Sequence, residues 1–268
     1  MSATGDEGAF RPLVSFVDVS FRFGGRDAPW ILRSVDLAIG RGEFFVLIGP
    51  SGCGKTTALN LLAGFEHPSA GQVLVDGEPV VEPGVERAVI FQGEDSLYPW
   101  LTVEENVTFS LRAAGLSRRE RHRRARPFLQ MVGLAGHRHK YPSELSGGMK
   151  QRVQLVRALV CDSLVLLMDE PFGALDAQTR SVLQDELARI WENNRVTILF
   201  ITHDIAEAVL LADRVGVMTA GPESIIKQVV PIDLPRPRSR SDPAFGAAYG
   251  QLNELLAEES RRALMDGQ

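Results

Sequence analysis

Residues 49–56 read Gly49-Pro50-Ser51-Gly52-Cys53-Gly54-Lys55-Thr56, and Thr57 follows them. This stretch matches the pattern G-x-x-x-x-G-K-[ST] and stands between a short apolar run, 44–48, and a helical pattern from about Thr56 to Ala63. Glycines let a backbone wrap closely around phosphate oxygens, and successive N–H groups at a helix start supply partial positive charge. We therefore expect a phosphate-binding loop formed by Gly49, Pro50, Ser51, Gly52, Cys53, Gly54, Lys55, Thr56 and Thr57.

Three side chains of this loop have different expected roles. Lys55 adds a full positive charge toward the β- and γ-phosphates, and the Thr56 hydroxyl is suited to ligate Mg²⁺. Cys53 has no acyl-transfer partners in the sequence, so we interpret it as a small loop filler rather than a catalytic thiol. The motif by itself predicts a nucleotide site and no particular reaction.

The composition is that of an ordinary globular protein and excludes several other classes. The 268 residues, 44% apolar and 24% charged, suit one large α/β domain or two small ones. The formal net charge of −5 argues against nucleic acid as a partner. Cys53 and Cys161 are too few for a disulfide framework. Since no apolar run approaches the roughly 18 residues of a membrane span and no secretory signal is visible, we expect any membrane role to come through a partner.

The order of apolar patterns predicts an α/β fold. Short runs at 88–91, 164–168, 196–201 and 215–218 alternate with helical patterns, which favours a mainly parallel sheet. Segments 13–23 and 35–39 also look like strands, and Asp76-Gly77 predicts a tight hairpin. Helical patterns at 102–113, 117–132 and 147–160 predict a helical insert of about 93–160. The Pro- and Arg-containing stretch 235–238 is interpreted as a linker to a terminal helix at 243–264.

Two adjacent carboxylates follow the apolar run at 164–168. Ligands of open α/β sheets bind at the carboxyl ends of the strands, so Asp169 is placed to hold Mg²⁺. Because neighbouring strand residues alternate in direction, we expect Glu170 to point the other way and to orient or deprotonate an attacking water. A pair of solvated acids is the alternative, which the presence of the Lys55 loop disfavours.

Read together with these motifs, Leu145-Ser146-Gly147-Gly148 resembles the signature of ATP-binding cassette (ABC) ATPases. Gln92 resembles the glutamine loop of that family, Ala174-Leu175-Asp176 the loop after the acidic pair, and His203 the switch histidine. Phe23 stands at the place of the aromatic residue that stacks on adenine, and Phe21 is its rival by proximity.

The resemblance implies an ABC ATPase fold, which is a P-loop NTPase core of α/β class with a mainly parallel sheet, an antiparallel β subdomain and a helical insert. It implies an ATP-binding domain at 13–235, after a leader at 1–12 and before a linker and helix at 236–268.

The resemblance also implies roles for individual residues. The catalytic set is Glu170, His203, Lys55 and Gln92, the Mg²⁺ set is Thr56, Gln92 and Asp169, and Phe23, Ser146, Gly147 and Gly148 join the phosphate loop in contacting ATP. Two positions depart from the family. Met149 stands where the pattern has glutamine, which removes an amide contact, and Phe23 stands where tyrosine is common.

Partners are likewise implied by the resemblance. The family forms a head-to-tail homodimer in which Ser146 of one copy faces the phosphate loop of the other. Segments 97–103, 145–152 and 168–176 resemble the nitrate/sulfonate/taurine importer branch. That implies transmembrane permease subunits, an extracytoplasmic solute-binding protein that acts indirectly, and a place on the cytoplasmic face of a bacterial membrane. An ATP-gated binding switch of a non-transport ABC protein stays open as the alternative.

Two surface features have competing interpretations. By resemblance, the segment after Gln92 with Tyr98, Pro99 and Trp100 receives the coupling helix of a permease, whereas Trp100 is equally suited to be a core residue under the insert. The arginine-rich stretch 117–126 is typical of a solvated helix face, and attraction to anionic lipid headgroups is the sharper alternative.

Overall fold

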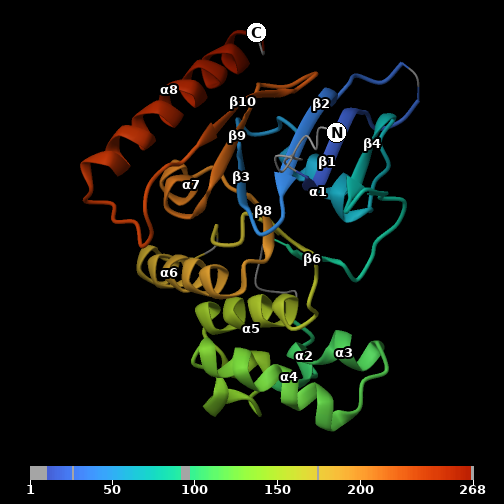
Figure 1. Cartoon of the computed structure of the whole chain (residues 1–268), viewed down its shortest axis with the longest axis vertical. Helices are drawn as coiled ribbons and strands as arrows, with labels where there is room; N and C mark the ends of the chain where they lie inside the picture. The colour runs from blue at the N-terminus through green and yellow to red at the C-terminus, as the bar shows by residue number, and fades with distance from the viewer. Residues whose placement is uncertain (1–10, 26, 92–96, 174, 267–268) are drawn as a thin grey trace, which may run out of the picture.

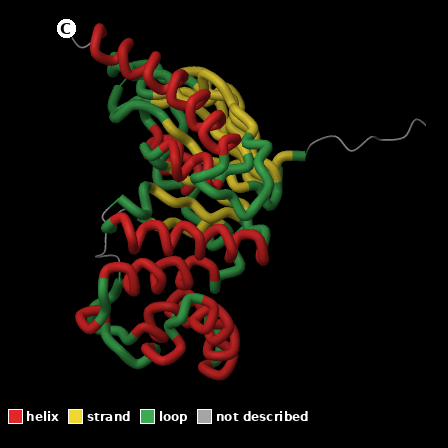
Figure 2. The backbone as a smooth tube through the Cα atoms, turned by 90° about the vertical axis from the view of Figure 1, so that its left-hand side faces the viewer, coloured by secondary structure: helices red, strands yellow, loops and turns green. Residues whose placement is uncertain are grey.

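The structure is a computed structural model that describes residues 11–25, 27–91, 97–173 and 175–266. Its strands gather in one part of an elongated molecule, and the helices between β6 and β7 form the other part, below the strands in Figure 1. The same stacking is seen from the side in Figure 2.

The central sheet has six strands in the order β10-β9-β3-β8-β7-β6. Five of them are parallel: β3 (Phe44–Ile48), β6 (Arg87–Ile90), β7 (Val165–Asp169), β8 (Thr197–Ile201) and β9 (Arg214–Met218). At one edge β10 (Ile226–Pro231) is antiparallel to β9. Every residue of β3 and β8 is buried, which explains their unbroken apolar runs. The prediction of a mainly parallel sheet is confirmed.

A second, antiparallel sheet has the order β2-β1-β4-β5. It consists of β1 (Pro12–Phe21), β2 (Leu32–Gly40), β4 (Ala70–Val75) and β5 (Glu78–Pro79). The first strand ends at Phe21 rather than at residue 23. The predicted hairpin is confirmed, because Asp76 (φ 52°) and Gly77 (φ 86°) both take the positive φ that a type I′ turn requires.

Helices cover both faces of the central sheet. On one face α1 (Lys55–Ala63) packs between the two sheets, where Leu47, Leu59 and Val73 share a core. On the other face lie α5 (Gly147–Leu159), α6 (Ala177–Asn194) and α7 (Ile205–Leu211), around Val46 and Trp191. The sheet is therefore buried on both sides and holds its strand ends rigidly.

The helical part contains α2 (Val103–Val107), α3 (Phe109–Ala113) and α4 (Arg118–Met131), with short 3₁₀ turns at Ala135–His137 and Pro142–Glu144. Thr102 and Glu105 form a capping box at the start of α2. The single helix expected from Thr102 to Ala113 is wrong. It is interrupted at Thr108, whose hydroxyl donates to the Glu104 carbonyl at 2.7 Å and whose backbone leaves helical geometry (φ −94°, ψ 6°).

The last helix, α8 (Pro243–Asp266), packs along α7 and β9 (Figure 1). The connection before it was predicted as a linker from its prolines and arginines, but its arginines are anchored. Arg238 donates to the carbonyls of Val209 (2.7 Å) and Ala212 (2.6 Å) at the end of α7, and burial lowers its pKa to about 10. Among the helices in the described ranges, none combines the length and apolarity that a bilayer crossing requires.

Candidate functional site

The phosphate loop connects β3 to α1 and has the backbone that its glycines predict. Gly52 (φ 79°) and Gly54 (φ 90°) are left-handed, a conformation that costs any other residue about 1–2 kcal/mol. A Cβ placed on Gly54 would also lie 2.8 Å from Cδ2 of Leu32. Glycine at position 54 is therefore required by conformation and by space.

Lys55 folds across this loop. Its side chain is 8% exposed, and Nζ donates to the carbonyls of Gly49 and Pro50, both at 2.9 Å. The ladder of α1 begins with the bond from Ala58 N–H to the Gly54 carbonyl, so the N–H groups of residues 55–57 lie ahead of it. A full charge and a helix start thus point into one loop, which is an arrangement for binding an anion.

Asp169, the last residue of β7, lies beside the start of α1. Thr56 Oγ1 donates to Asp169 Oδ2 at 2.9 Å. Burial raises the pKa of Asp169 and the Glu170 charge adds to this, whereas the Thr56 hydrogen bond and Lys55 oppose it. A carboxylate and a hydroxyl are hard oxygen donors of the kind that Mg²⁺ prefers, and a bound divalent cation would relieve the buried charge. The residues present therefore fit Mg²⁺.

Glu170 turns away from Asp169 toward the end of β8. Its N–H donates to the Ile201 carbonyl at 3.0 Å, and its Oε2 lies 3.1 Å from His203 Nδ1. The two carboxylates diverge as predicted, but strand alternation is not the cause. β7 ends at Asp169, and Glu170 has a left-handed backbone (φ 43°), a strained conformation for a residue with a side chain.

A buried carboxylate behind His203 was missed by the sequence analysis. Asp204 caps α7 by accepting from the N–H groups of Ala206 and Glu207. The Glu207 side chain turns inward and accepts from Thr202 Oγ1 (2.6 Å) and Gln184 Nε2 (2.8 Å). Burial raises the pKa of Glu207. Gln184 lies 23 residues from Glu207 in the sequence, on another helix, so no local pattern indicates this network.

The Leu-Ser-Gly-Gly turn lies on the surface of the helical part. Leu145 is buried and anchors it, whereas Ser146 is exposed and caps α5 by accepting from the Met149 N–H at 3.4 Å. A Cβ on Gly148 would lie 2.6 Å from Cγ2 of Thr179 on α6. Met149 packs partly buried against the core. The turn is thus accessible to a neighbouring molecule.

The structure separates the two candidate adenine contacts. Phe21 is 3% exposed and belongs to the core, whereas Phe23 is 56% exposed and meets Phe21 edge to face, with ring centroids 4.8 Å apart. Phe23 is therefore the aromatic residue available for stacking. Gln92 and Ala174 lie outside the described residues, so the structure says nothing of their positions.

Trp100 is exposed, so its interpretation as a core residue is wrong. Its side chain is 69% exposed and contacts Tyr98, with ring centroids 5.6 Å apart. Tyr98 also lines a cavity of about 560 Å³ between the helical part and β6, together with Val89 and Phe109. An exposed tryptophan that packs on a half-buried tyrosine beside an apolar cavity is suited to receive another protein segment.

The arginine-rich helix α4 compensates part of its own charge. Glu120 binds Arg123 at 2.6 Å and Arg124 at 3.2 Å, and these hydrogen bonds lower the pKa of Glu120 to about 2. Arg124 also pairs with Asp162 at 3.0 Å. These contacts favour a solvated helix face over a dedicated lipid contact.

Comparison with known proteins agrees with this geometry. Residues 32–173 match the family model described as ABC transporter. An uncharacterised ABC transporter ATP-binding protein of Methanocaldococcus jannaschii is 46% identical over 91% of this chain and 90% of its own length. The nitrate import ATP-binding protein NrtD of Synechococcus elongatus is 48% identical over 82% and 81%. The bicarbonate transport protein CmpC of the same species is 46% identical over 91% of this chain but 37% of CmpC.

Two solved structures have the same fold. The protein cbiO1 of Clostridium perfringens, part of the ABC transporter complex cbiONQ, has a TM-score of 0.75 at 26% identity and covers 82% of this chain and 89% of its own. The ATP-binding cassette MJ0796, a dimer in a post-hydrolysis state with ADP and Pi, has a TM-score of 0.69 at 29% identity over 82% and 99%.

The contact between Gly148 and Thr179 generates a stability prediction. Alanine normally stabilises a helix relative to glycine. In Gly148→Ala, however, the new Cβ would clash with Cγ2 of Thr179. We expect the variant to lose about 1–3 kcal/mol of unfolding free energy, as for other overpacked sites. Adding Thr179→Ser removes the clashing methyl group and should restore most of this loss. Denaturant unfolding of both variants and of Thr179→Ser alone measures it, and wild-type stability of Gly148→Ala would contradict it.

Proposed function

Because this chain belongs to the family of ABC transporter ATP-binding proteins and is an ATPase subunit coupled to transport, we propose that two copies close head to tail around ATP and energise the import of a small oxyanion. One observation carries the proposal. The phosphate loop and the Glu170–His203 pair lie at the carboxyl edge of the central sheet, whereas exposed Ser146 starts a helix of the other part. One copy thus presents two separate anion-binding ends.

The phosphate loop binds the nucleotide tail in this proposal. Lys55 exchanges the carbonyls of Gly49 and Pro50 for β- and γ-phosphate oxygens, which are stronger acceptors because they are charged. The N–H groups at the start of α1 bind the same tail, and Phe23 stacks on the adenine. Thr56 and Asp169 hold Mg²⁺, with Gln92 as a third ligand expected from the family resemblance. The bound metal supplies positive charge that neutralises the phosphate oxygens.

Glu170 accepts the proton of the attacking water in our proposal. Its carboxylate projects from the end of β7 toward His203, so it is held in one direction by that contact and by its own backbone bond to Ile201. His203 then stands beside the γ-phosphate, where an N–H donor stabilises developing charge. Lys55 and the loop amides stabilise the charge from the opposite side.

Ser146 completes the site of the second copy. Ser146 is the N-cap of the 13-residue helix α5, so its hydroxyl and the positive end of the helix form a second anion site. A two-fold axis then pairs Lys55 of each copy with Ser146 of the other. The dimeric state recorded for MJ0796 with ADP and Pi supports this assembly. The γ-phosphate supplies charge that both copies bind, and its loss reopens the dimer.

The relatives support an importer of a small oxyanion. NrtD is named for nitrate import and CmpC for bicarbonate transport, and we extend the class to sulfonates such as taurine on the family resemblance. Import ATP-binding proteins as relatives favour this function over a non-transport binding switch. Exposed Trp100, together with half-buried Tyr98, receives a transmembrane permease subunit at the cytoplasmic face of the membrane, and an extracytoplasmic solute-binding protein acts through that permease.

We predict that Glu170→Gln binds ATP, hydrolyses it at least about 100-fold more slowly and accumulates as a closed dimer, because the amide keeps the shape but cannot take a proton. Phosphate release and size-exclusion chromatography with Mg-ATP measure both effects. Asp185→Asn on α6, outside the site, is a control for loss of one acid. Full turnover by Glu170→Gln would remove Glu170 from the role of base.

Ser146→Arg tests whether the site is shared between copies. We expect it to abolish turnover while each monomer still binds ATP, because the substitution lies on the surface that faces the partner. Mixed with Lys55→Ala, it should recover one working site per mixed dimer, since each mutant supplies what the other lacks. An absence of recovery at every mixing ratio would contradict a shared site.

Trp100→Ala tests permease contact and solute together. In proteoliposomes with the cognate permease and binding protein, we expect nitrate, bicarbonate or taurine uptake to fall at least about 10-fold, as for removal of an interface anchor, with basal ATPase unchanged. Phe65→Ala, another exposed aromatic, is the matched control. Uptake that is equal in the two variants would contradict docking at Trp100.

A further inference from the structure

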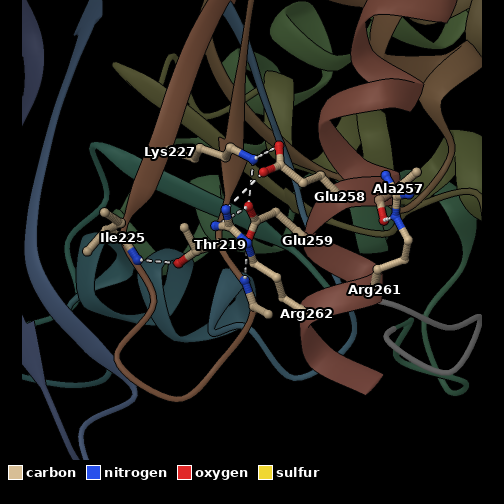
Figure 3. A network of polar contacts seen from close by, with 9 residues as sticks. Thr219, Ile225, Lys227, Ala257, Glu258, Glu259, Arg261 and Arg262 are labelled. Atoms are coloured by element: carbon tan, nitrogen blue, oxygen red, sulfur yellow. Dashed lines mark hydrogen bonds and ion pairs between the residues drawn. The ribbon is translucent and has the colours of Figure 1, made fainter. Parts of the chain in front are cut away.

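A buried carboxylate near the end of the chain accepts three hydrogen bonds. Glu259 of α8 is 1% exposed, and Lys227 of β10 donates to its Oε1 at 2.6 Å and to Glu258 Oε2 at 2.6 Å (Figure 3). Arg262, one turn further on α8, donates to the same two acids at 3.2 and 2.8 Å. The third bond is different, because it comes from the backbone: the Ala220 N–H donates to Glu259 Oε2 at 3.1 Å.

Ala220 belongs to the loop between β9 and β10, residues 219–225. The loop is closed at its base by two bonds between Thr219 and Ile225, from Thr219 N–H to the Ile225 carbonyl and from Ile225 N–H to Thr219 Oγ1, both at 3.0 Å. The Glu259 bond therefore attaches α8 to a closed loop and not to a loose strand (Figure 3).

The other side of this loop lies against the phosphate loop. A Cβ on Gly221 would lie 3.3 Å from the Gly52 carbonyl oxygen and 3.8 Å from Cα of Cys53. The preceding residue of β9, Met218, lies behind the same turn, with its Cβ 3.0 Å from a Cβ placed on Gly49. The segment from Met218 to Gly221 thus supports the phosphate loop from behind.

A second contact runs from the same loop through the segment before β2. Ser224 N–H donates to the Ile31 carbonyl at 3.0 Å, and the Arg33 N–H donates to the Ser224 carbonyl at 3.2 Å. Ile31 and Leu32 in turn lie against Gly54, at 3.0 and 2.8 Å from a Cβ placed there. The loop at 219–225 therefore connects α8 to both left-handed glycines of the phosphate loop.

We propose that Glu259 is a positioning residue for ATP binding, whose buried carboxylate holds the Ala220 N–H and thereby keeps the 219–225 loop against the phosphate loop. The proposal rests on the nucleotide role proposed above for that loop. Lys227 and Arg262 balance the buried charge, and Glu259 Oε2 is left to accept the backbone N–H. α8 thus acts on the reaction without touching the nucleotide.

Glu258 provides a matched control for the experiment. It shares Lys227 and Arg262 with Glu259, and the Ala220 bond belongs to Glu259. In the full chain, Glu259→Ala should raise the Kd for Mg-ATP and the KM of hydrolysis by about 3- to 10-fold with kcat nearly unchanged, because it weakens binding of ground and transition states alike. Glu258→Ala should change both constants by less than about 2-fold.

A conservative variant separates positioning from stability. Glu259→Gln keeps an oxygen for the Ala220 N–H, so it should recover most of the ATP affinity even if the lost charge lowers Tm. A purely structural role predicts the opposite, with lower Tm and unchanged Kd in the folded protein for both substitutions. Equal Kd values for Glu259→Ala, Glu258→Ala and wild type would overturn the proposal.

Two further variants keep the test decisive. If Glu259→Ala does not fold, Gly221→Ala tests the contact between the 219–225 loop and the phosphate loop directly, because its Cβ would lie close to the Gly52 carbonyl oxygen. A raised Kd for Mg-ATP in this variant supports the proposal, and an unchanged Kd overturns it. Lys55→Ala should abolish Mg-ATP binding. Retained binding in Lys55→Ala would contradict the proposed nucleotide site itself, whereas loss of binding there with no Glu259 effect would contradict the positioning role alone.

Discussion

Neighbouring elements pack closely against the phosphate loop from behind. Cys53 and Met218 crowd Gly49, the 219–225 loop lies against Gly52, and Leu32 lies against Gly54. These contacts come from a neighbouring strand, from a loop beyond it and from the antiparallel sheet. Because the loop is held from several sides, its N–H groups keep their directions before any nucleotide arrives, and little ordering entropy remains to be lost on binding. The two sheets and α1 are arranged around this constraint.

The charged groups depend on the same framework. β7 and β8 are adjacent parallel strands, so Asp169 and His203 emerge at one edge, and Thr56 reaches Asp169 from the start of α1. Burial would favour a protonated Asp169, and a cation beside it would favour the carboxylate, so the strand end is matched to a metal rather than to an acid. Glu170 follows Asp169 directly in the sequence. Its left-handed backbone turns its carboxylate away from Asp169 and toward His203.

Local pattern was enough to predict the central features of the site and not the contacts behind it. The glycines, Lys55 and the acidic pair could be recognised because each depends on its own neighbours in sequence. The predicted helix is interrupted at Thr108, where the hydroxyl donates to the Glu104 carbonyl and the backbone angles leave the helical range. The choice between Phe21 and Phe23, and the exposure of Trp100, required burial, which is a property of the whole fold. Glu207 and Glu259 bind partners far along the chain, so periodicity does not indicate them.

A site divided between two copies places a particular demand on each copy. In the proposed head-to-tail dimer, the second copy binds through a few N–H groups and the Ser146 hydroxyl, whose hydrogen bonds are directional and short-ranged. A small displacement of the phosphate loop would move the γ-phosphate away from the partner's helix and weaken closure as well as binding. Rigid support from behind the loop is therefore a condition for assembly, and the distant position of α8 is consistent with it, because a support must leave the nucleotide-facing side open to the partner.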